Sequence, residues 1–297
     1  TLNFFCVQSE GNHIDNSISY GNVDSEKIIG KYNKKTKKKI FISTKVSAKN
    51  LSYKNFIKST MKSLKNLKVK RVDLIQPHWP NYKLDNNDMA KAFKYLKKRG
   101  KVRYFGLSNY DLKDIKYFKK KLRDSFKFIQ DEFSIRDRSL ENKIKYCEKN
   151  NIKIICYSPF GSGDIVFSAK ENEILNLMMK KYRRSRYSII LNYLASKSKN
   201  IILIPHTKKI THLKDNLSSL KFKLNSKDIR KLDVYFKPNY IYLKLKEVVY
   251  YNKKYKKITN LKDALNNKGE LHPSPKTLSK ILKKGHNLKL IKLKKIN

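Results

Sequence analysis

Residues 40–78 read IFISTKVSAKNLSYKNFIKSTMKSLKNLKVKRVDLIQPH, and this stretch decides the fold. It begins with the apolar run Ile40–Thr44 and ends with a second apolar run, Val72–Pro77. Between them, the apolar residues of Tyr53–Leu67 recur at helical spacing. Strand-length apolar runs separated by an amphipathic helix are typical of a βαβ unit with parallel strands. The stretch therefore predicts a parallel α/β sheet.

The same alternation continues along most of the chain. Further helices are expected at Met89–Lys98, from about Asp111 to Leu122 and from Leu140 to Asn150, and further strands at Val102–Leu107, Phe126–Gln130, Ile152–Tyr157 and Ile201–Ile204. With the run before Asp15 these make seven strands, whereas a closed (β/α)8 TIM barrel has eight. We predict such a barrel over residues 1–237 with its first strand missing, and a small basic α+β appendage over residues 238–297.

Composition narrows the class of protein. A chain of 297 residues can bury a large core. No apolar run approaches the roughly 18 residues that a membrane helix needs. The three cysteines, Cys6, Cys147 and Cys156, lack metal-ligand spacing and fit packed thiols in a reducing compartment. We therefore expect a cytoplasmic protein with no metal site and no membrane partner.

The formal net charge of +46 raises the alternative of a nucleic-acid-binding protein. Arginine supplies only ten of the 70 basic residues, and the lysines are scattered among Asn, Ile and Tyr, which share A/T-rich codons. A binding face would more often concentrate arginine beside aromatic side chains. We interpret the charge as surface composition and keep nucleic-acid binding as a less favoured alternative.

Four polar residues lie at or just after the ends of the first three apolar runs, namely Asp15, Tyr20, Lys45 and His78. Parallel α/β barrels collect their chemistry at the carboxyl ends of their strands. A phenol is a slow proton donor at neutral pH, and a neighbouring ammonium such as that of Lys45 favours its ionised form. Asp15 would keep Lys45 charged, and His78 would help to bind a carbonyl oxygen.

The order of motifs resembles the aldo-keto reductase superfamily over roughly residues 1–236. The motifs that carry the resemblance are His13–Gly21, Ser25-Glu26 with Gly30, Ile42–Lys45, Asp73–Pro80, Gly100–Asn109, Gln130–Ser134 and Tyr157–Gly161. The first departs from the family pattern at Asn16 and Ser17, which we expect not to contact the chemistry. The family's first strand and the hairpin before it are expected upstream of Thr1. Open strand edges lead us to expect low solubility or activity of this chain.

The resemblance implies the catalytic residues above and an NADPH site without a G-x-G-x-x-G fingerprint. It assigns ten cofactor-binding positions: Ser108, Asn109 and Gln130 to the carboxamide, Tyr157 to the nicotinamide ring, Ser158, Phe160 and Ser162 to the pyrophosphate, Thr207 to the 2′-phosphate, and Asp215 and Asn216 to the adenine. His206 and His212 replace residues that are commonly Lys or Gly and Arg in the family. We favour NADPH and leave NADH possible, because histidines are weaker phosphate partners.

The function expected from this resemblance is reduction of an aldehyde, ketone or sugar-like carbonyl by NADPH, with Tyr20 as general acid. One alternative is a regulatory subunit on the same fold that binds cofactor and turns over slowly, like the potassium-channel β subunits. The expected partner is a small-molecule carbonyl substrate, and the oligomeric state stays open. The long segment Ser158–Arg186 is interpreted as a lid or binding loop.

Overall fold

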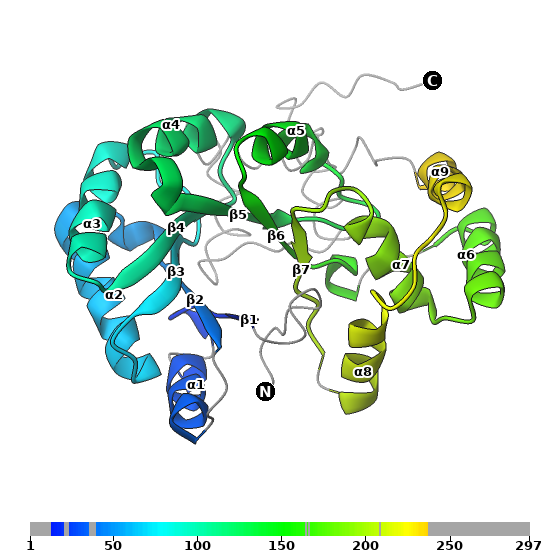
Figure 1. The fold of residues 1–297 in the computed structure, drawn as a ribbon, viewed down its shortest axis with the longest axis horizontal. Coiled ribbons are helices and arrows are strands. Elements are labelled where there is room, and N and C mark those ends of the chain that lie inside the picture. The colour runs from blue at the N-terminus through cyan, green and yellow to red at the C-terminus, as the bar shows by residue number, and fades with distance from the viewer. Residues whose placement is uncertain are drawn as a thin grey trace, which may run out of the picture.

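The computed structural model describes residues 13–20, 24–35, 40–163, 165, 167–207 and 209–236. In these ranges, seven parallel strands form one sheet in the order β1-β2-β3-β4-β5-β6-β7. The sheet curls, and the helices lie on its outer side (Figure 1). The strands are β1 (His13–Asp15), β2 (Phe41–Val46), β3 (Val72–Pro77), β4 (Val102–Ser108), β5 (Phe126–Glu132), β6 (Lys153–Tyr157) and β7 (Ile201–Leu203).

One α-helix follows each of the strands β1 to β5 in the chain, and two α-helices follow each of β6 and β7. The α-helices are α1 (Asp24–Lys35), α2 (Tyr53–Leu67), α3 (Asn86–Lys98), α4 (Leu112–Leu122), α5 (Glu141–Lys149), α6 (Ala169–Tyr182), α7 (Arg186–Ala195), α8 (Ile210–Ser218) and α9 (Ser226–Tyr235). Short 3₁₀ turns are η2 (Ala48–Asn50), η3 (Arg123–Ser125) and η4 (Gly161–Gly163). Carboxylates cap two of the helices, because Asp85 and Asp111 accept backbone N–H groups at the starts of α3 and α4.

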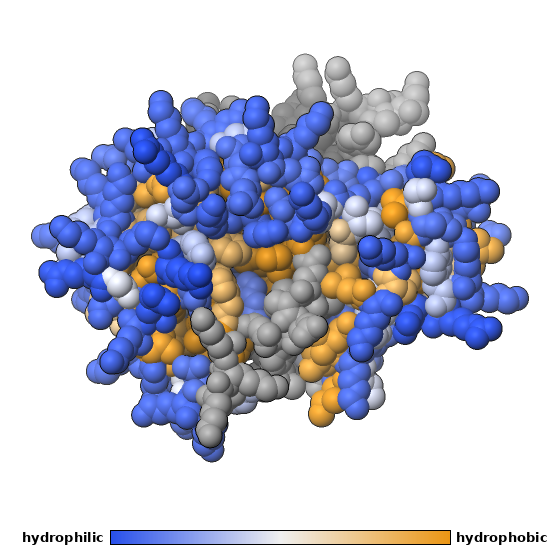
Figure 2. Space-filling view, viewed as in Figure 1, coloured by the Kyte–Doolittle hydropathy of each residue, from blue (hydrophilic) through white to orange (hydrophobic). Residues whose placement is uncertain are grey.

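The two faces of the sheet bury different apolar layers. On β3, Leu74 belongs to a small cluster with Phe128 and Ile155, whereas the adjacent Ile75 belongs to the large core that includes the helices. Successive side chains of a strand point to opposite faces, so one strand contributes to both layers. Figure 2 shows hydrophobic residues toward the middle of the molecule and along α8, with hydrophilic residues over much of the remaining surface in view.

Within the described residues, the predicted fold is confirmed as a curled, parallel sheet of the (β/α)8 type with seven strands, one fewer than a closed barrel has. Among the described residues, β1 pairs only with β2 and β7 only with β6. The predicted helix over Tyr53–Leu67 is α2, with the same bounds. Residues 238–297 lie outside the described residues, so the α+β appendage stays a prediction.

The interpretation of Ser158–Arg186 as a loop was wrong. The segment contains η4 and the whole of α6, and α6 packs against α7 and α9. Ser168 begins α6 with a capping box in which its side chain and that of Glu171 bond each other's backbone. Ile174, Leu175 and Met178 are buried, so this segment is part of the core. None of the helices that the structure describes has the length and apolar character of a membrane span.

Candidate active site

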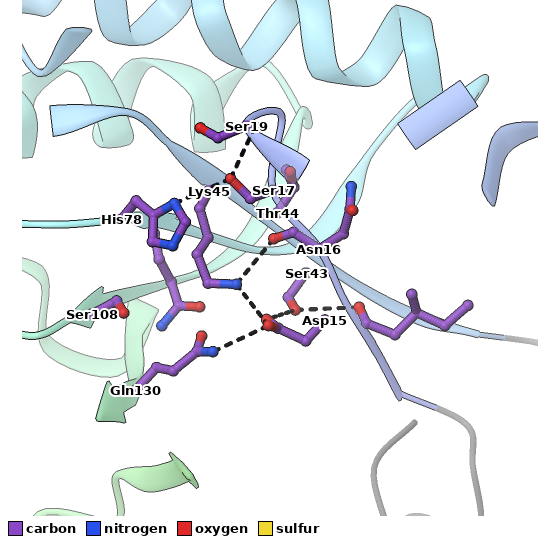
Figure 3. A network of polar contacts seen from close by, with 12 residues as sticks. Asp15, Asn16, Ser17, Ser19, Ser43, Thr44, Lys45, His78, Ser108 and Gln130 are labelled. Atoms are coloured by element: carbon purple, nitrogen blue, oxygen red, sulfur yellow. Dashed lines mark hydrogen bonds and ion pairs between the residues drawn. The ribbon is translucent and has the colours of Figure 1, made fainter. Parts of the chain in front are cut away.

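The ends of β1 and β2 hold a buried ion pair. Lys45 Nζ lies 2.7 Å from Asp15 Oδ2 and donates a second hydrogen bond of 3.0 Å to the backbone oxygen of Asn16. Both side chains are 1% exposed. The other donors to the carboxylate are Gln130 Nε2, 3.1 Å from Oδ2, and Ser43 Oγ, 3.0 Å from Oδ1. Figure 3 shows Asp15 where these side chains converge.

The surroundings of Asp15 favour its ionised carboxylate form. Burial alone would raise the pKa of Asp15, but the charge and hydrogen bond of Lys45, with the donor of Gln130, hold that pKa below its ordinary value. A buried carboxylate is stable only when its charge is paired and its lone pairs accept hydrogen bonds. The site therefore holds a fixed ammonium at the ends of the strands.

Tyr20 and His78 complete the group of four. Lys45 Nζ lies 5.2 Å from the centre of the Tyr20 ring, and the Tyr20 and His78 rings meet edge to face with centroids 5.6 Å apart. The backbone N–H of His78 donates to Val46 O at 2.8 Å, which holds the histidine at the end of β2. Tyr20 is half-buried and His78 is buried. The structure thus brings together all four residues predicted to be catalytic.

The expectation that Asn16 and Ser17 lie away from the chemistry was wrong. The backbone oxygen of Asn16 accepts a hydrogen bond from Lys45 Nζ, and Ser17 Oγ lies 3.2 Å from His78 Nδ1. These contacts arise because the chain turns directly after β1 and passes over the end of β2. Figure 3 shows Ser17 between Ser19 and His78.

The residues predicted to contact a nicotinamide lie on the neighbouring strands β4, β5 and β6, except Asn109, which directly follows β4. Asn109 Nδ2 donates to His78 O and to Ser108 Oγ, both at 3.1 Å, and its Oδ1 accepts from the Tyr157 hydroxyl at 2.7 Å. Asn109 has a positive φ of 65°, a conformation that asparagine tolerates better than most residues. One amide therefore connects the His78 backbone to Tyr157.

The side-chain amide of Gln130 has one polar atom without a partner among the described residues. Its Nε2 must face the acceptor-only Asp15 carboxylate, so its Oε1 points elsewhere. That oxygen is buried, and no described residue donates to it. A buried acceptor without a donor is costly, and an amide N–H₂ group of a bound nicotinamide would satisfy it.

Comparisons with known proteins identify the family of this chain. The model of the aldo/keto reductase family matches residues 6–235. The chain belongs to the aldo/keto reductase family. Members of this family are NAD(P)H-dependent oxidoreductases that use NADPH and act on small-molecule carbonyl compounds. The family, enzyme class and cofactor predicted from the sequence are confirmed at this level.

Three of the matches show how similar this chain is to individual proteins of known sequence or structure. An uncharacterized oxidoreductase of Schizosaccharomyces pombe is 32% identical over 58% of this chain, and the match spans only about half of that relative, 54% of its length. Glyoxal reductase of Bacillus subtilis is 26% identical, over 74% of this chain and 77% of its own length. A thermostable aldo-keto reductase solved with the inhibitor epalrestat is 28% identical with a TM-score of 0.72, over 77% of this chain and 84% of its own.

The residues of the reductase predicted to lie near a pyrophosphate follow β6. Ser158 and Ser162 have positive φ values of 50° and 59°, and their hydroxyl oxygens are 3.3 Å apart. Phe160 meets Tyr187 edge to face, with ring centres 5.0 Å apart. Ser162 is exposed and Ser158 is half-buried. This tight turn of the backbone brings the two hydroxyls together after the end of β6.

The residues predicted to contact the adenosine phosphate lie after β7 and on α8. Thr207 Oγ1 accepts from the backbone of Lys209 at 3.1 Å, and Asn216 is buried. The carboxylate of Asp215 accepts hydrogen bonds from Ser185 and Ser188 at the start of α7. In this structure Asp215 therefore ties α8 to α7, and any contact with adenine would share that carboxylate. Lys208 lies outside the described residues.

Sequence reasoning missed three polar residues of the site, His13, Ser43 and Gln76. His13 lies two residues before Asp15, and Ser43 lies two residues before Lys45. Because side chains two apart on a strand point to the same face, this spacing could have identified them. All three are buried. Gln76 is the neighbour of Lys45 in the register of β2 and β3, and its Oε1 has no donor among the described residues.

Proposed function

We propose that this chain reduces a carbonyl group of a small molecule with hydride from NADPH, and that Tyr20 is the general acid. The observation that carries the proposal is the buried Asp15–Lys45 pair with the ammonium 5.2 Å from the Tyr20 ring. When bound, NADPH supplies the hydride. The residues of this chain supply the proton and the polar environment of the carbonyl oxygen.

The proton is provided by the Tyr20 hydroxyl. A free phenol has a pKa near 10 and donates slowly at neutral pH. The Lys45 ammonium favours the phenolate that remains after donation, because opposite charges attract strongly where water is excluded. Asp15 keeps the ammonium charged and fixed, and Asn16 O orients its second N–H group.

His78 provides a second hydrogen bond to the carbonyl oxygen. In the arrangement that we propose, Ser17 Oγ accepts from the backbone N–H of Ser19 at 3.2 Å and donates its own hydrogen to His78 Nδ1. An Nδ1 that accepts leaves the ring proton on Nε2, which is the tautomer that donates to a carbonyl oxygen. Tyr20 and His78 together form an oxyanion site.

Four residues would hold the nicotinamide. Gln130 Oε1 would accept from the carboxamide, Ser108 and Asn109 would complete its hydrogen bonds, and the half-buried ring of Tyr157 would stack on the nicotinamide and set which face is presented. Ser158, Phe160 and Ser162 would lie along the pyrophosphate, with Thr207, Asp215 and Asn216 at the adenosine phosphate. We propose a preference for NADPH; a Michaelis constant for NADH equal to or below that for NADPH would contradict it.

The substrate class we propose is an aldehyde, a ketone or a sugar-like carbonyl compound. Trp79 directly follows His78 and is half-buried, and Phe160 lies on the turn after Tyr157. Two aromatic side chains beside the site favour an apolar or ring-shaped substrate. A panel of aliphatic aldehydes, aromatic aldehydes and cyclic ketones, compared by kcat/KM, tests this preference.

The deciding experiment is carbonyl-dependent oxidation of NADPH by the purified chain and by Tyr20→Phe. General acid catalysis contributes roughly 10²–10⁴-fold, so kcat of the variant should fall by that factor. The matched control is Tyr32→Phe, because Tyr32 is 52% exposed on α1. Equal activity of Tyr20→Phe and Tyr32→Phe would refute the role of Tyr20. Oxidation that proceeds at the same rate without a carbonyl compound would refute the proposed reaction.

A further inference from the structure

A second layer of polar residues lies behind the Asp15–Lys45 pair. His13 Nε2 lies 2.9 Å from Ser43 Oγ, and Ser43 Oγ lies 3.0 Å from Asp15 Oδ1. His13 is 4% exposed and Ser43 is fully buried. The catalytic roles described above leave this chain of contacts unused, although it ends on the carboxylate that holds Lys45.

The direction of the hydrogen bonds follows from the carboxylate. The ionised Asp15 carboxylate only accepts, so the Ser43 hydroxyl is the donor in this contact, and its single hydrogen is shared between Asp15 Oδ1 at 3.0 Å and Ile14 O at 3.3 Å. Ser43 Oγ must then accept from His13, which places the ring proton of His13 on Nε2. The reverse order would set two lone pairs against each other 3.0 Å apart inside the protein. The contacts therefore form a one-way series of donors from His13 through Ser43 to Asp15.

We propose that His13, acting through Ser43, is a positioning residue that holds the Asp15 carboxylate turned so that Lys45 stays at Tyr20. This inference rests on the proposed function, in which Lys45 acts on Tyr20. The Ser43 donor occupies Oδ1, so Oδ2 is the oxygen that meets Lys45 and Gln130. A carboxylate without the Ser43 donor can rotate and take both oxygens to the ammonium, which draws Lys45 away from the phenol.

His13 suits this role because it stays neutral. Burial lowers the pKa of His13 to about 4, with Asp15 opposing that shift and Lys45 adding to it. A neutral ring with a hydrogen on Nε2 donates without adding a second positive charge beside Lys45. His13 also meets Phe41 edge to face, with centroids 4.9 Å apart, so packing fixes the plane of its ring.

The test follows ionisation of Tyr20 rather than turnover. The charged and titratable groups that face Tyr20 in the described contacts are Lys45 from β2 and His78 after β3. Phenolate absorbance is titrated in each protein and in the same protein carrying Tyr20→Phe, and the difference reports Tyr20 alone. We expect His13→Phe, which keeps the apolar ring and removes the donor, to move this titration to higher pH. His13→Gln, which restores an N–H donor, should return it toward the original pH.

Ser43→Ala is a second variant that alters the side chain less, and it should also shift the Tyr20 titration to higher pH. The inference is overturned if neither His13→Phe nor Ser43→Ala moves the titration, or if His13→Gln behaves like His13→Phe. A folded state is verified by cooperative thermal unfolding; if His13→Phe is unfolded, Ser43→Ala decides alone. The readout needs no substrate, so the two proposals can fail separately. An unshifted Tyr20 titration with NADPH oxidation intact would refute the role of His13 alone, and a shifted titration without NADPH oxidation would refute the proposed function alone.

Turnover provides an independent check when the proposed function holds. A hydrogen bond to a charged group contributes about 1.5–3 kcal/mol, so kcat of Ser43→Ala should fall by roughly tenfold or more. The pH at which reduction declines on the alkaline side should rise in parallel with the Tyr20 titration. A lower kcat with an unchanged pH profile would indicate a merely structural role and would also overturn the inference.

Discussion

The ends of β1–β3 hold a completed ion pair, whereas the residues predicted to bind nicotinamide at the ends of β4–β6 are all neutral. At β1–β3, the Asp15 carboxylate accepts from Ser43, Lys45 and Gln130, and the Lys45 ammonium has two oxygen acceptors. Neutral amide atoms lack a partner among the described residues in both regions: Gln130 Oε1 at β4–β6, and Gln76 Oε1 and Asn16 Nδ2 at β1–β3. The ring of Tyr157 at β4–β6 stays half-buried.

The difference follows from the cost of each kind of unpaired group. A buried charge without its partner costs several kcal/mol, so an acid–base pair must be complete before any ligand arrives. A neutral amide that lacks one hydrogen bond costs about 1–3 kcal/mol, which a folded chain can sustain. We infer that the Asp15–Lys45 pair of the proton-donating half is preformed, whereas the hydrogen bonds of Gln130 in the nicotinamide half are completed by the cofactor.

Among these predictions, replacement of Asp15 should have the largest effect, a loss of stability. Asp15→Ala leaves the Lys45 ammonium buried and uncompensated, so the free energy of unfolding should fall by about 3–5 kcal/mol. Denaturant unfolding measures this, with Asp124→Ala as the control because Asp124 is 92% exposed. The double variant Asp15→Leu with Lys45→Met should be more stable than Asp15→Ala. Equal stability of Asp15→Ala and Asp124→Ala would contradict a preformed, paired site.

The pH dependence of stability tests the layer behind the pair. The pKa of His13 lies at about 4 when folded and near 6.5 when unfolded, so the unfolded chain binds the extra proton between these values. The contribution of His13 to the free energy of unfolding is complete above pH 6.5. It falls as the pH drops toward 4, by about 3 kcal/mol in total. Relative to His13→Gln, the native protein should lose this amount over that window.

Asp114 acts in the opposite direction over part of this range. Burial, and then the charge of Asp111, raise the pKa of Asp114 to about 6, so its contribution declines as the pH rises. Because Asp114 is present in both proteins, the difference between them isolates His13. A difference that is constant with pH would show that His13 is not held neutral by burial.

The smallest expected effect is on the affinity for NADPH, and it follows from replacing Gln130 in the nicotinamide half. Gln130→Met keeps the length of the side chain and removes the unsatisfied acceptor together with the Nε2 donor to Asp15 Oδ2. The dissociation constant for NADPH, measured by quenching of protein fluorescence, should rise roughly tenfold, the equivalent of one hydrogen bond. Tyr20→Phe is the matched control and should bind NADPH as the native protein does. Unchanged affinity in Gln130→Met would remove the assignment of Gln130 to the carboxamide.

The sequence predicted the parts of the site that depend on periodicity. Asp15, Lys45 and His78 follow apolar runs, so their place at one end of a parallel sheet could be deduced. Ser17 could not be placed, because it lies in a turn whose path depends on packing over β2. The hydrogen bonds that Asp215 accepts could not be predicted either, because their donors Ser185 and Ser188 are about 30 residues earlier in the chain. Helix α6 was missed because the Gly161–Gly163 turn before it was taken to introduce a loop.

The most direct measurement is a single turnover of Tyr20→Phe with NADPH bound and a carbonyl substrate added. If the two halves work as described, this variant binds NADPH with native affinity, because Tyr20 lies in the proton-donating half. Hydride transfer, followed by loss of NADPH absorbance, should then slow by roughly 10²–10⁴-fold. Transfer at the native rate would contradict the account, because the proton would then come from a group other than Tyr20.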